Sequence, residues 1–229
     1  MNKQIKHKLR SGREVELKLS EDGSHTLYVP ELDEHYHSVY GARTESMHVF
    51  INTGLEHITK KNIRILEVGF GTGLNALLTA LHKGEKIIEY HSLEKYPLNP
   101  GLENILQFAE KEDDETKAVF DKIHKADWNK PADIIPGFKL LKLEADLLTY
   151  EFTKKYDLIY FDAFAPDVQP ELWTIDIFRK LYNTMNPAAV LTTYSAKGTV
   201  RRALQSAGFS VERLPGPPGK REMLRAVKN

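Results

Sequence analysis

The sequence predicts an α/β fold with a doubly wound, mostly parallel sheet and a C-terminal antiparallel hairpin. Three observations support this prediction. From Asn62 onward short apolar segments alternate with amphipathic ones, a glycine-rich turn follows the first apolar segment, and a Pro/Gly loop separates two alternating segments near the C-terminus. Strands and helices that alternate at these lengths connect through right-handed crossovers, which produce a parallel sheet covered by helices.

The expected elements of this fold can be placed along the chain. The expected strands are Ile63–Val68, Ile87–Leu93, Phe138–Leu143, Leu158–Phe161 and Val190–Thr193. The expected helices are Leu74–Lys83, Pro97–Glu110, Leu172–Met185 and Thr199–Ala207. The first of these helices carries leucines on one face, as burial against a sheet requires. The hairpin pairs Phe209–Leu214 with Met223–Val227.

The region before the alternating pattern has a different character. Arg13–Leu19 and Thr26–Val29 alternate like short strands around a turn, and Val39–Ile58 is largely helical in pattern. We therefore expect an N-terminal extension, residues 1–60, packed on a catalytic domain of residues 61–229.

The composition is that of an ordinary globular protein. Hydrophobic residues make up 41% of the 229 residues and charged residues 28%, and there is no cysteine. No segment approaches the roughly 18 apolar residues of a membrane span, and the basic N-terminus lacks the apolar core of a signal peptide. We expect a cytoplasmic protein with no membrane partner. The close histidine pair, His35 and His37, is interpreted as loop, so no metal is expected.

The charges are unevenly distributed although the net charge is zero. Residues 1–20 carry six Lys/Arg and two Glu, and residues 197–229 carry eight Lys/Arg and two Glu, so the middle of the chain is acidic. Basic ends indicate a polyanionic partner, but solvated termini would explain them equally well.

The turn after the first strand is the most informative segment. Gly69, Gly71 and Gly73 let the chain turn tightly and let a ligand approach the backbone. A dinucleotide-binding turn would need its third glycine at position 74, where Leu74 stands. The pattern from Glu67 to Gly73 instead resembles the first motif of class I methyltransferases, which implies that Glu67 lies near the methionine amino group of the cofactor.

Acidic residues end the next two strands. A carboxylate at Glu94, at the tip of the second strand, can accept both ribose hydroxyls of an adenosyl cofactor, although the Glu94-Lys95 pair could also be a surface ion pair. After the third strand, Glu144 and Asp146 are alternatives for an acid that holds the adenine amino group, as class I methyltransferases often do, and Asp146 is preferred.

The fourth strand ends in Asp162-Ala-Phe-Ala-Pro166, at the place where this fold presents the reacting group. Methyl transfer to an amine requires a neutral nitrogen, while an alkyl amine has a pKa of roughly 10. A carboxylate at Asp162 could orient the amine and accept its proton, or it could only cap the turn. Beyond it, Phe164 or Trp173 could stack on a base, and Trp173 could instead pack in the core.

These motifs together resemble one family. Gly69-Phe-Gly-Thr-Gly-Leu-Asn75, Ser92-Leu-Glu-Lys-Tyr-Pro97, Asp162-Ala-Phe-Ala-Pro166 and the Gly219-Lys-Arg-Glu-Met223 tail are similar to the methyltransferase half of bifunctional tRNA 5-methylaminomethyl-2-thiouridine biosynthesis enzymes, the MnmC type. The resemblance covers roughly residues 38–227. It implies a class I S-adenosylmethionine-dependent methyltransferase of Rossmann-like fold, acting on 5-aminomethyl-2-thiouridine at the wobble position of tRNA.

The resemblance also implies roles for individual residues. Asp162 becomes the catalytic acid. The expected cofactor site comprises Glu67, Gly69, Phe70, Gly71, Gly73, Asn75, Glu94, Lys95, Asp146 and Asp162. The expected contacts to the anticodon loop are Phe164, Trp173, Arg201, Arg202, Lys220 and Arg221, of which the basic residues would meet phosphates unless they are simply solvated. We expect a methyltransferase without the oxidase half of that family, so that a separate enzyme would supply the aminomethyl precursor.

Two other functions remain open at this point. An aminopropyltransferase of the spermidine-synthase type shares the sheet, the glycine turn and the acid after the fourth strand, but its small acceptor gives basic ends no purpose. A tRNA-binding module without catalysis would keep the fold, and the intact Asp162 and glycines argue against it.

Overall fold

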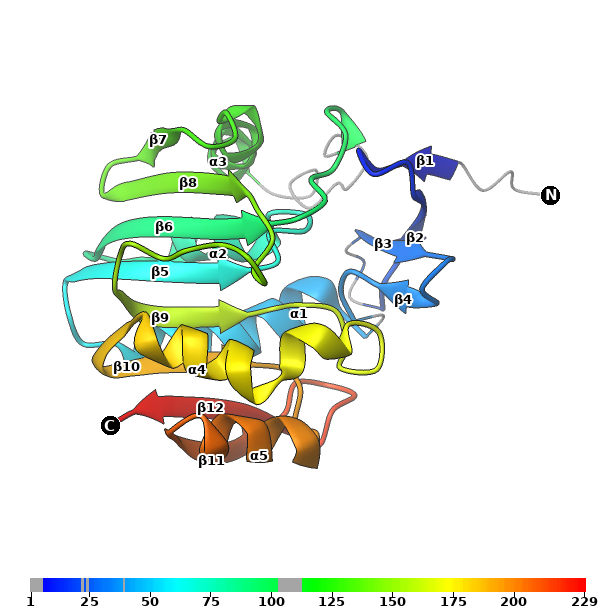
Figure 1. Cartoon of the computed structure of the whole chain (residues 1–229). Coiled ribbons are helices and arrows are strands. Elements are labelled where there is room, and N and C mark those ends of the chain that lie inside the picture. Colours follow the sequence, from blue (N-terminus) through cyan, green and yellow to red (C-terminus); the bar gives the residue numbers. More distant parts are fainter. Residues whose placement is uncertain (1–5, 22, 24, 39, 103–112) are drawn as a thin grey trace.

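The computed structural model describes residues 6–21, 23, 25–38, 40–102 and 113–229. Within this part of the chain, one sheet of eight strands forms the body of the molecule and a four-stranded sheet is built from the N-terminal region (Figure 1). The order of the large sheet is β11-β12-β10-β9-β5-β6-β8-β7. Its strands are β5 (Asn62–Val68), β6 (Ile87–Glu94), β7 (Pro131–Ile135), β8 (Phe138–Glu144), β9 (Tyr156–Phe161), β10 (Met185–Thr193), β11 (Phe209–Pro215) and β12 (Glu222–Lys228).

The five central strands are parallel, as the sequence predicts. β8, β6, β5, β9 and β10 pair in parallel, whereas β7 pairs antiparallel with β8, and β12 pairs antiparallel with both β10 and β11. The α/β fold with a mostly parallel sheet and a C-terminal antiparallel hairpin is therefore confirmed. β5 leads to β6 on one side and β9 leads to β10 on the other, so the carboxyl ends of β5 and β9 flank a crevice of the kind that binds ligands in open α/β sheets.

Helices cover both faces of this sheet (Figure 1). They are α2 (Leu74–His82), α3 (Asp114–Lys125), α4 (Ile175–Asn183) and α5 (Gly198–Ser206), with a short 3₁₀ segment, η4 (Pro170–Trp173). One apolar core includes α2 and α3, and a second includes α4 and α5. Burial on both faces explains why β9 is apolar almost throughout and shows no alternation.

Three predicted details are corrected by the structure. The single helix predicted over Leu172–Met185 is η4 followed by α4, because Thr174 caps α4 by accepting the N–H of Ile177 at 3.4 Å, and Met185 already belongs to β10. Of the helix predicted over Pro97–Glu110, residues 97–102 form no α-helix and the rest lies outside the described residues. Helix α3 and strand β7 were not predicted, because charged residues obscure their short apolar patterns.

The N-terminal region forms its own antiparallel sheet and a helical segment. The strands are β1 (Lys6–Lys8), β2 (Glu14–Leu19), β3 (His25–Val29) and β4 (Glu34–His35), so His35 lies in a strand and not in the predicted loop. The helical segment comprises α1 (Ala42–Ser46), a π-helical turn η1 (Met47–Asn52) and a 3₁₀ turn η2 (Leu55–His57). Figure 1 shows this sheet beyond the carboxyl ends of the parallel strands, where it faces the crevice.

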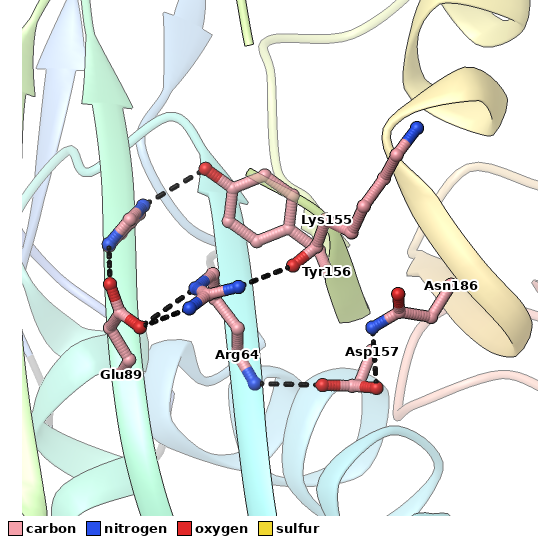
Figure 2. A network of polar contacts seen from close by, with 7 residues as sticks. Arg64, Glu89, Lys155, Tyr156, Asp157 and Asn186 are labelled. Atoms are coloured by element: carbon pink, nitrogen blue, oxygen red, sulfur yellow. Dashed lines mark hydrogen bonds and ion pairs between the residues drawn. The ribbon is translucent and has the colours of Figure 1, made fainter. Parts of the chain in front are cut away.

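The opposite, amino-terminal edge of the large sheet is held by a network of charged groups (Figure 2). Asp157 on β9 accepts the backbone N–H of Arg64 at 3.0 Å and the side-chain amide of Asn186 at 2.9 Å. Arg64 in turn donates to Glu89 on β6 at 2.8 Å and to the carbonyl of Lys155 at 3.0 Å. The network ties β5, β6, β9 and β10 together at the end that is remote from the crevice.

Among the described residues, no helix is long and apolar enough to cross a membrane.

Candidate active site

A cavity of about 540 Å³ lies at the carboxyl ends of the parallel strands. Its walls come from the residues that follow β5, β6, β8 and β9, from the N-terminal segment 34–38, from α1 and from the loop between β11 and β12. Segments far apart in the sequence therefore meet at one place, as expected for a ligand site of this fold. Of the predicted site residues, the cavity is lined by Gly69, Phe70, Gly71, Glu94, Lys95, Asp146, Asp162, Phe164 and Lys220.

The glycine turn has backbone angles that few other residues tolerate. Gly69, Gly71 and Gly73 have φ values of 91°, 51° and 78°. A Cβ atom at Gly69 would lie 2.6 Å from the carbonyl oxygen of Asp162, so any side chain there would force the turns after β5 and β9 apart. Gly73 is the N-cap of α2, and it lies beneath the turn instead of lining the cavity.

Asp162 lines the cavity directly after β9. Its backbone N–H bonds to the carbonyl of Val68 at 3.0 Å, which joins it to the strand that carries the glycine turn. Its carboxylate accepts a hydrogen bond of 2.8 Å from the side-chain amide of Asn75 in α2. Burial raises the pKa of Asp162 to about 7, and the Asn75 hydrogen bond offsets part of that effect. A carboxyl group with this pKa can both accept and release a proton near neutral pH.

A second acid lies under the floor of the cavity. Glu67 is fully buried in β5, where one carboxylate oxygen accepts the hydroxyl of Ser92 at 2.6 Å. Its other oxygen and the amide oxygen of Asn75 have no hydrogen-bond partner among the described residues. Burial raises the pKa of Glu67 to about 8, the Ser92 hydrogen bond lowers it, and the nearby charge of Asp162 raises it further. Glu67 and Asn75 therefore influence the pKa and orientation of Asp162 and do not form part of the cavity wall.

Two acids lie at the tips of neighbouring strands on the other side of the cavity. The carboxylate of Glu94 accepts the backbone N–H groups of Gly71 at 3.1 Å and Tyr96 at 2.8 Å, which fixes its orientation against the glycine turn. Asp146 pairs with Lys95 at 2.8 Å and accepts the N–H of Leu148 at 2.9 Å. Glu144, the predicted alternative to Asp146, is not among the described lining residues and pairs with Arg10 at 3.2 Å.

The N-terminal segment contributes residues that the sequence did not point to. The ring of Tyr36 packs edge-on against Phe164 with their centroids 5.1 Å apart, and it lies next to Gly71. His37 bonds to Thr72 within the glycine turn at 2.6 Å. Tyr36 and His37 thus close the cavity from the side of the small sheet, and only the unusual aromatic density of residues 35–37 could have indicated them.

Residues 94–229 match the family described as S-adenosyl-L-methionine-dependent methyltransferase, which is more than half of the chain. The chain belongs to this family.

Relatives within this family carry more specific names. The chain is 33% identical to the tRNA 5-methylaminomethyl-2-thiouridine biosynthesis bifunctional protein MnmC of Burkholderia multivorans, over 91% of the chain but 34% of that relative. It thus spans about a third of the length of the curated relatives that it matches. Among solved structures, MNMC2 from Aquifex aeolicus matches with a TM-score of 0.73 and 26% identity, over 96% of the chain and 72% of that structure.

A third match concerns the fold alone. Spermidine synthase from Thermotoga maritima superimposes with a TM-score of 0.63 over 98% of the chain and 72% of that structure, but only 12% of the residues are identical. A shared fold does not imply a shared substrate.

S-adenosylmethionine is the cofactor of this methyltransferase, and the cavity fits it. Gly69 and Gly71 present bare backbone along one wall. A carboxylate offers about four lone-pair sites, so Glu94 retains acceptors for two ribose hydroxyls after it has bound two N–H groups. Phe70, Leu93 and Leu147 provide apolar wall between Glu94 and Asp146, as a flat adenine ring requires. The bound cofactor supplies an electrophilic methyl group on a sulfonium.

Some predicted contacts are corrected by their positions. Trp173 is only 6% exposed, packs against Phe161 with centroids 4.8 Å apart, and donates its indole N–H to the carbonyl of Phe164 at 2.8 Å. It belongs to the core and holds the loop after Asp162, so stacking on a base is excluded for Trp173 in this arrangement. Glu67, Gly73 and Asn75 do not line the cavity, so their contact with the cofactor stays a prediction.

The predicted phosphate contacts fall into two groups. Arg202 and Arg221 are exposed and Arg201 is half-buried, and no ion pair between described residues involves any of the three. Lys220 differs, because it lines the cavity and pairs with Glu45. All four lie at the same edge of the sheet as the cavity, since α5 follows the carboxyl end of β10 and the β11–β12 loop returns beside it.

Among the residues that the structure describes, no group of three or more His, Asp or Glu side chains is placed to hold a metal ion. That the reaction needs no metal stays a prediction.

Proposed function

We propose that this methyltransferase transfers a methyl group from S-adenosylmethionine to the aminomethyl nitrogen of 5-aminomethyl-2-thiouridine at the tRNA wobble position, giving 5-methylaminomethyl-2-thiouridine. The observation that carries the proposal is the position of Asp162, an acid with a pKa of about 7 that lines the cavity beside the glycine turn. The names of the relatives from Burkholderia multivorans and Aquifex aeolicus support the choice of acceptor.

Asp162 would act on the acceptor nitrogen in two ways. An alkyl ammonium group has no lone pair to attack with, and its pKa of roughly 10 keeps it charged at neutral pH. The Asp162 carboxylate would attract this ammonium, orient it and take one of its protons as the reaction begins. Positioning supplies much of the remaining rate, because methyl transfer is an in-line displacement between two held reactants.

Contacts to the rest of the tRNA would come from the rim of the cavity. Phe164 lines the cavity and is available for stacking on a base that leaves the anticodon loop. Arg201, Arg202 and Arg221 lie at the same edge, where they would meet phosphates of the backbone. The acceptor must arrive with a free amine, so a separate activity that supplies the aminomethyl group forms part of the proposal. A cytoplasmic location also stays a prediction.

The decisive experiment uses purified protein, methyl-labelled S-adenosylmethionine and tRNA that carries unmethylated 5-aminomethyl-2-thiouridine. Digestion to nucleosides and mass analysis should show conversion to the methylaminomethyl form, and Asp162→Asn should abolish it without preventing cofactor binding. Label on another nucleoside would overturn the acceptor. Transfer only to a polyamine, with decarboxylated cofactor as donor, would favour the aminopropyltransferase alternative.

A further inference from the structure

An ion pair in the wall of the cavity connects α1 with the loop between β11 and β12. The ammonium of Lys220, in the loop between β11 and β12, bonds to the carboxylate of Glu45 in α1. Both residues line the cavity, and their side chains are mostly buried, at 33% and 12% exposed. The pair therefore connects the two ends of the chain across the site, and Lys220 is not an open cation of the kind that meets a phosphate.

Further contacts hold both partners in place. The ammonium of Lys220 lies 4.0 Å from the ring centroid of Tyr194, whose hydroxyl donates to the carbonyl of Ala163 at 2.8 Å. The second oxygen of Glu45 accepts the backbone N–H of Ser38 at 3.1 Å. Ala163 directly follows Asp162. The contacts from Lys220 to Tyr194 and from Tyr194 to Ala163 therefore link the cation to the backbone that carries the catalytic acid.

The charges of the pair act on Asp162 with opposite sign. Glu45 disfavours an ionised Asp162 and Lys220 favours it, although burial is the larger influence on its pKa. The titratable and polar groups that also face Asp162 are Glu67 on β5, Asn75 on α2, Tyr90 on β6 and Tyr194 after β10. Of all these groups, Lys220 alone carries a positive charge.

We propose that Lys220, oriented by Glu45, is a positioning residue that keeps Asp162 ionised until the acceptor amine has delivered its proton. This inference rests on the proposed function. In the step concerned, an N–H bond of the acceptor ammonium breaks and an O–H bond forms on Asp162, while the electron pair stays on nitrogen. The ammonium and the carboxylate both become neutral, so the net charge of the cavity does not change.

The Lys220–Glu45 pair remains balanced throughout this step. Without Lys220, the uncompensated charge of Glu45 would raise the pKa of Asp162. Asp162 would then be protonated at higher pH and could not accept the proton of the amine. Without Glu45, the free charge of Lys220 would stabilise the carboxylate and repel the incoming ammonium. The two residues thus have opposite effects on the pKa of Asp162, so their substitutions should have opposite consequences.

The test compares Lys220→Met and Glu45→Gln, with Lys61→Met as a control at the exposed Lys61–Glu85 pair on the amino-terminal edge. The carboxyl carbon of Asp162 is followed by ¹³C NMR titration, assigned through Asp162→Asn, with neither cofactor nor tRNA present. We expect the midpoint to rise by about one pH unit in Lys220→Met and to fall in Glu45→Gln. Lys61→Met should titrate like the wild type.

Steady-state rates give the second readout. The acid limb of kcat against pH should move with the NMR midpoint. Lys220→Arg keeps the positive charge and should give the wild-type profile. This variant tests the inference even if Lys220→Met is too unstable to measure. Midpoints that do not move, or that move in the same direction in both variants, would overturn the inference. So would a loss of tRNA affinity with a smaller salt dependence and an unchanged acid limb, which would make Lys220 a phosphate contact.

The titration separates this inference from the proposed function. If the wild type does not methylate tRNA, the acceptor is wrong, and the NMR midpoints still decide whether the pair controls Asp162.

Discussion

The two ends of β9 carry aspartates in opposite circumstances. Asp157, near the amino end, accepts hydrogen bonds from the backbone of Arg64 and from Asn186 (Figure 2). It also accepts one from Lys60, and together these bonds outweigh burial and lower its pKa. Asp162, just past the carboxyl end, has one hydrogen bond from Asn75, and burial raises its pKa to about 7. Four buried residues of one strand separate an acid with several hydrogen-bond donors from an acid with one.

The difference shows how one sheet serves stability at one edge and chemistry at the other. At the amino edge, paired charges favour the folded state, since their ionised forms are better stabilised there than in the unfolded chain. At the carboxyl edge, Asp162 is buried and its carboxylate accepts one hydrogen bond, which costs stability but leaves it able to exchange a proton near neutral pH. Glu67 beneath the cavity extends this pattern, because its pKa also lies well above the ordinary range.

The largest expected effect is on activity. Asp162→Asn keeps the shape and the Asn75 contact but removes the proton acceptor, so kcat should fall about 1000-fold. Asp157→Asn should change kcat less than about threefold, because it lies at the remote edge. Labelled methyl transfer to tRNA measures both, with calorimetric binding of S-adenosylmethionine as the control. A decrease of less than tenfold in Asp162→Asn would show that the acid only orients the turn.

The same two substitutions should change stability in opposite directions. The pKa of Asp162 is raised in the folded state, so its contribution to stability is lost as pH rises from about 4 to 7. At pH 8, Asp162→Asn should therefore be more stable than the wild type, by at most about 4 kcal/mol.

Asp157→Asn should instead lower stability by about 2 kcal/mol at pH 8, because hydrogen bonds to a charged group are lost. The pKa of Asp157 is lowered on folding, so this difference should shrink as pH falls below about 4. Urea unfolding at several pH values measures all three proteins. Stabilities that follow the same pH course in both variants would contradict the contrast between the two edges.

Glycines at the two edges provide a smaller comparison. Gly69 and Gly84 both have positive φ, but a Cβ at Gly69 meets the carbonyl oxygen of Asp162 at 2.6 Å, whereas Gly84 has open space around it. Gly69→Ala should lower the free energy of unfolding by about 3 kcal/mol, and Gly84→Ala by about 1 kcal/mol. Denaturant midpoints measure both. Equal effects would show that backbone strain alone, and not the close approach of β9, requires glycine at position 69.

The smallest expected effect concerns the rim. Arg202→Ala should weaken tRNA binding about threefold and reduce the slope of log Kd against log salt by about one. Lys61→Ala, which removes an equal charge from the opposite edge, should leave both unchanged. Filter binding at several salt concentrations measures them. If both variants changed the affinity and its salt dependence equally, the tRNA would not bind at the edge that carries Arg202.

The sequence predicted what is local and missed what depends on packing between distant segments. The sequence placed the glycine turn, Glu94, Asp146 and Asp162 at one site, because the ends of parallel strands must meet at one edge of the sheet, and the structure has them around one cavity. Trp173 could not be assigned from sequence, since a buried and a stacking tryptophan have the same spacing.

The missed residues of the site share one property. Tyr36 and Glu45 reach the cavity because the N-terminal region lies beyond the strand ends, and only the aromatic density of residues 35–37 gave a local signal, for Tyr36. Lys220 was predicted to contact a tRNA phosphate, and its ion pair with Glu45 was missed because the two residues lie 175 positions apart. The unpredicted α3 and β7 are short elements whose charged residues obscure the apolar pattern.

The position of β12 has a consequence for how the protein is made. β12 lies between β10 and β11, so β11 joins the sheet only through a strand that is synthesised after it. A nascent chain that ends before Glu222 leaves the edge of β10 unpaired and open to other strands. The β11–β12 loop that carries Lys220 is anchored to the sheet only once β12 has paired with β10, so this part of the cavity wall is completed late in synthesis. Measuring cofactor binding by nascent chains arrested at different lengths would show at which length the site becomes complete.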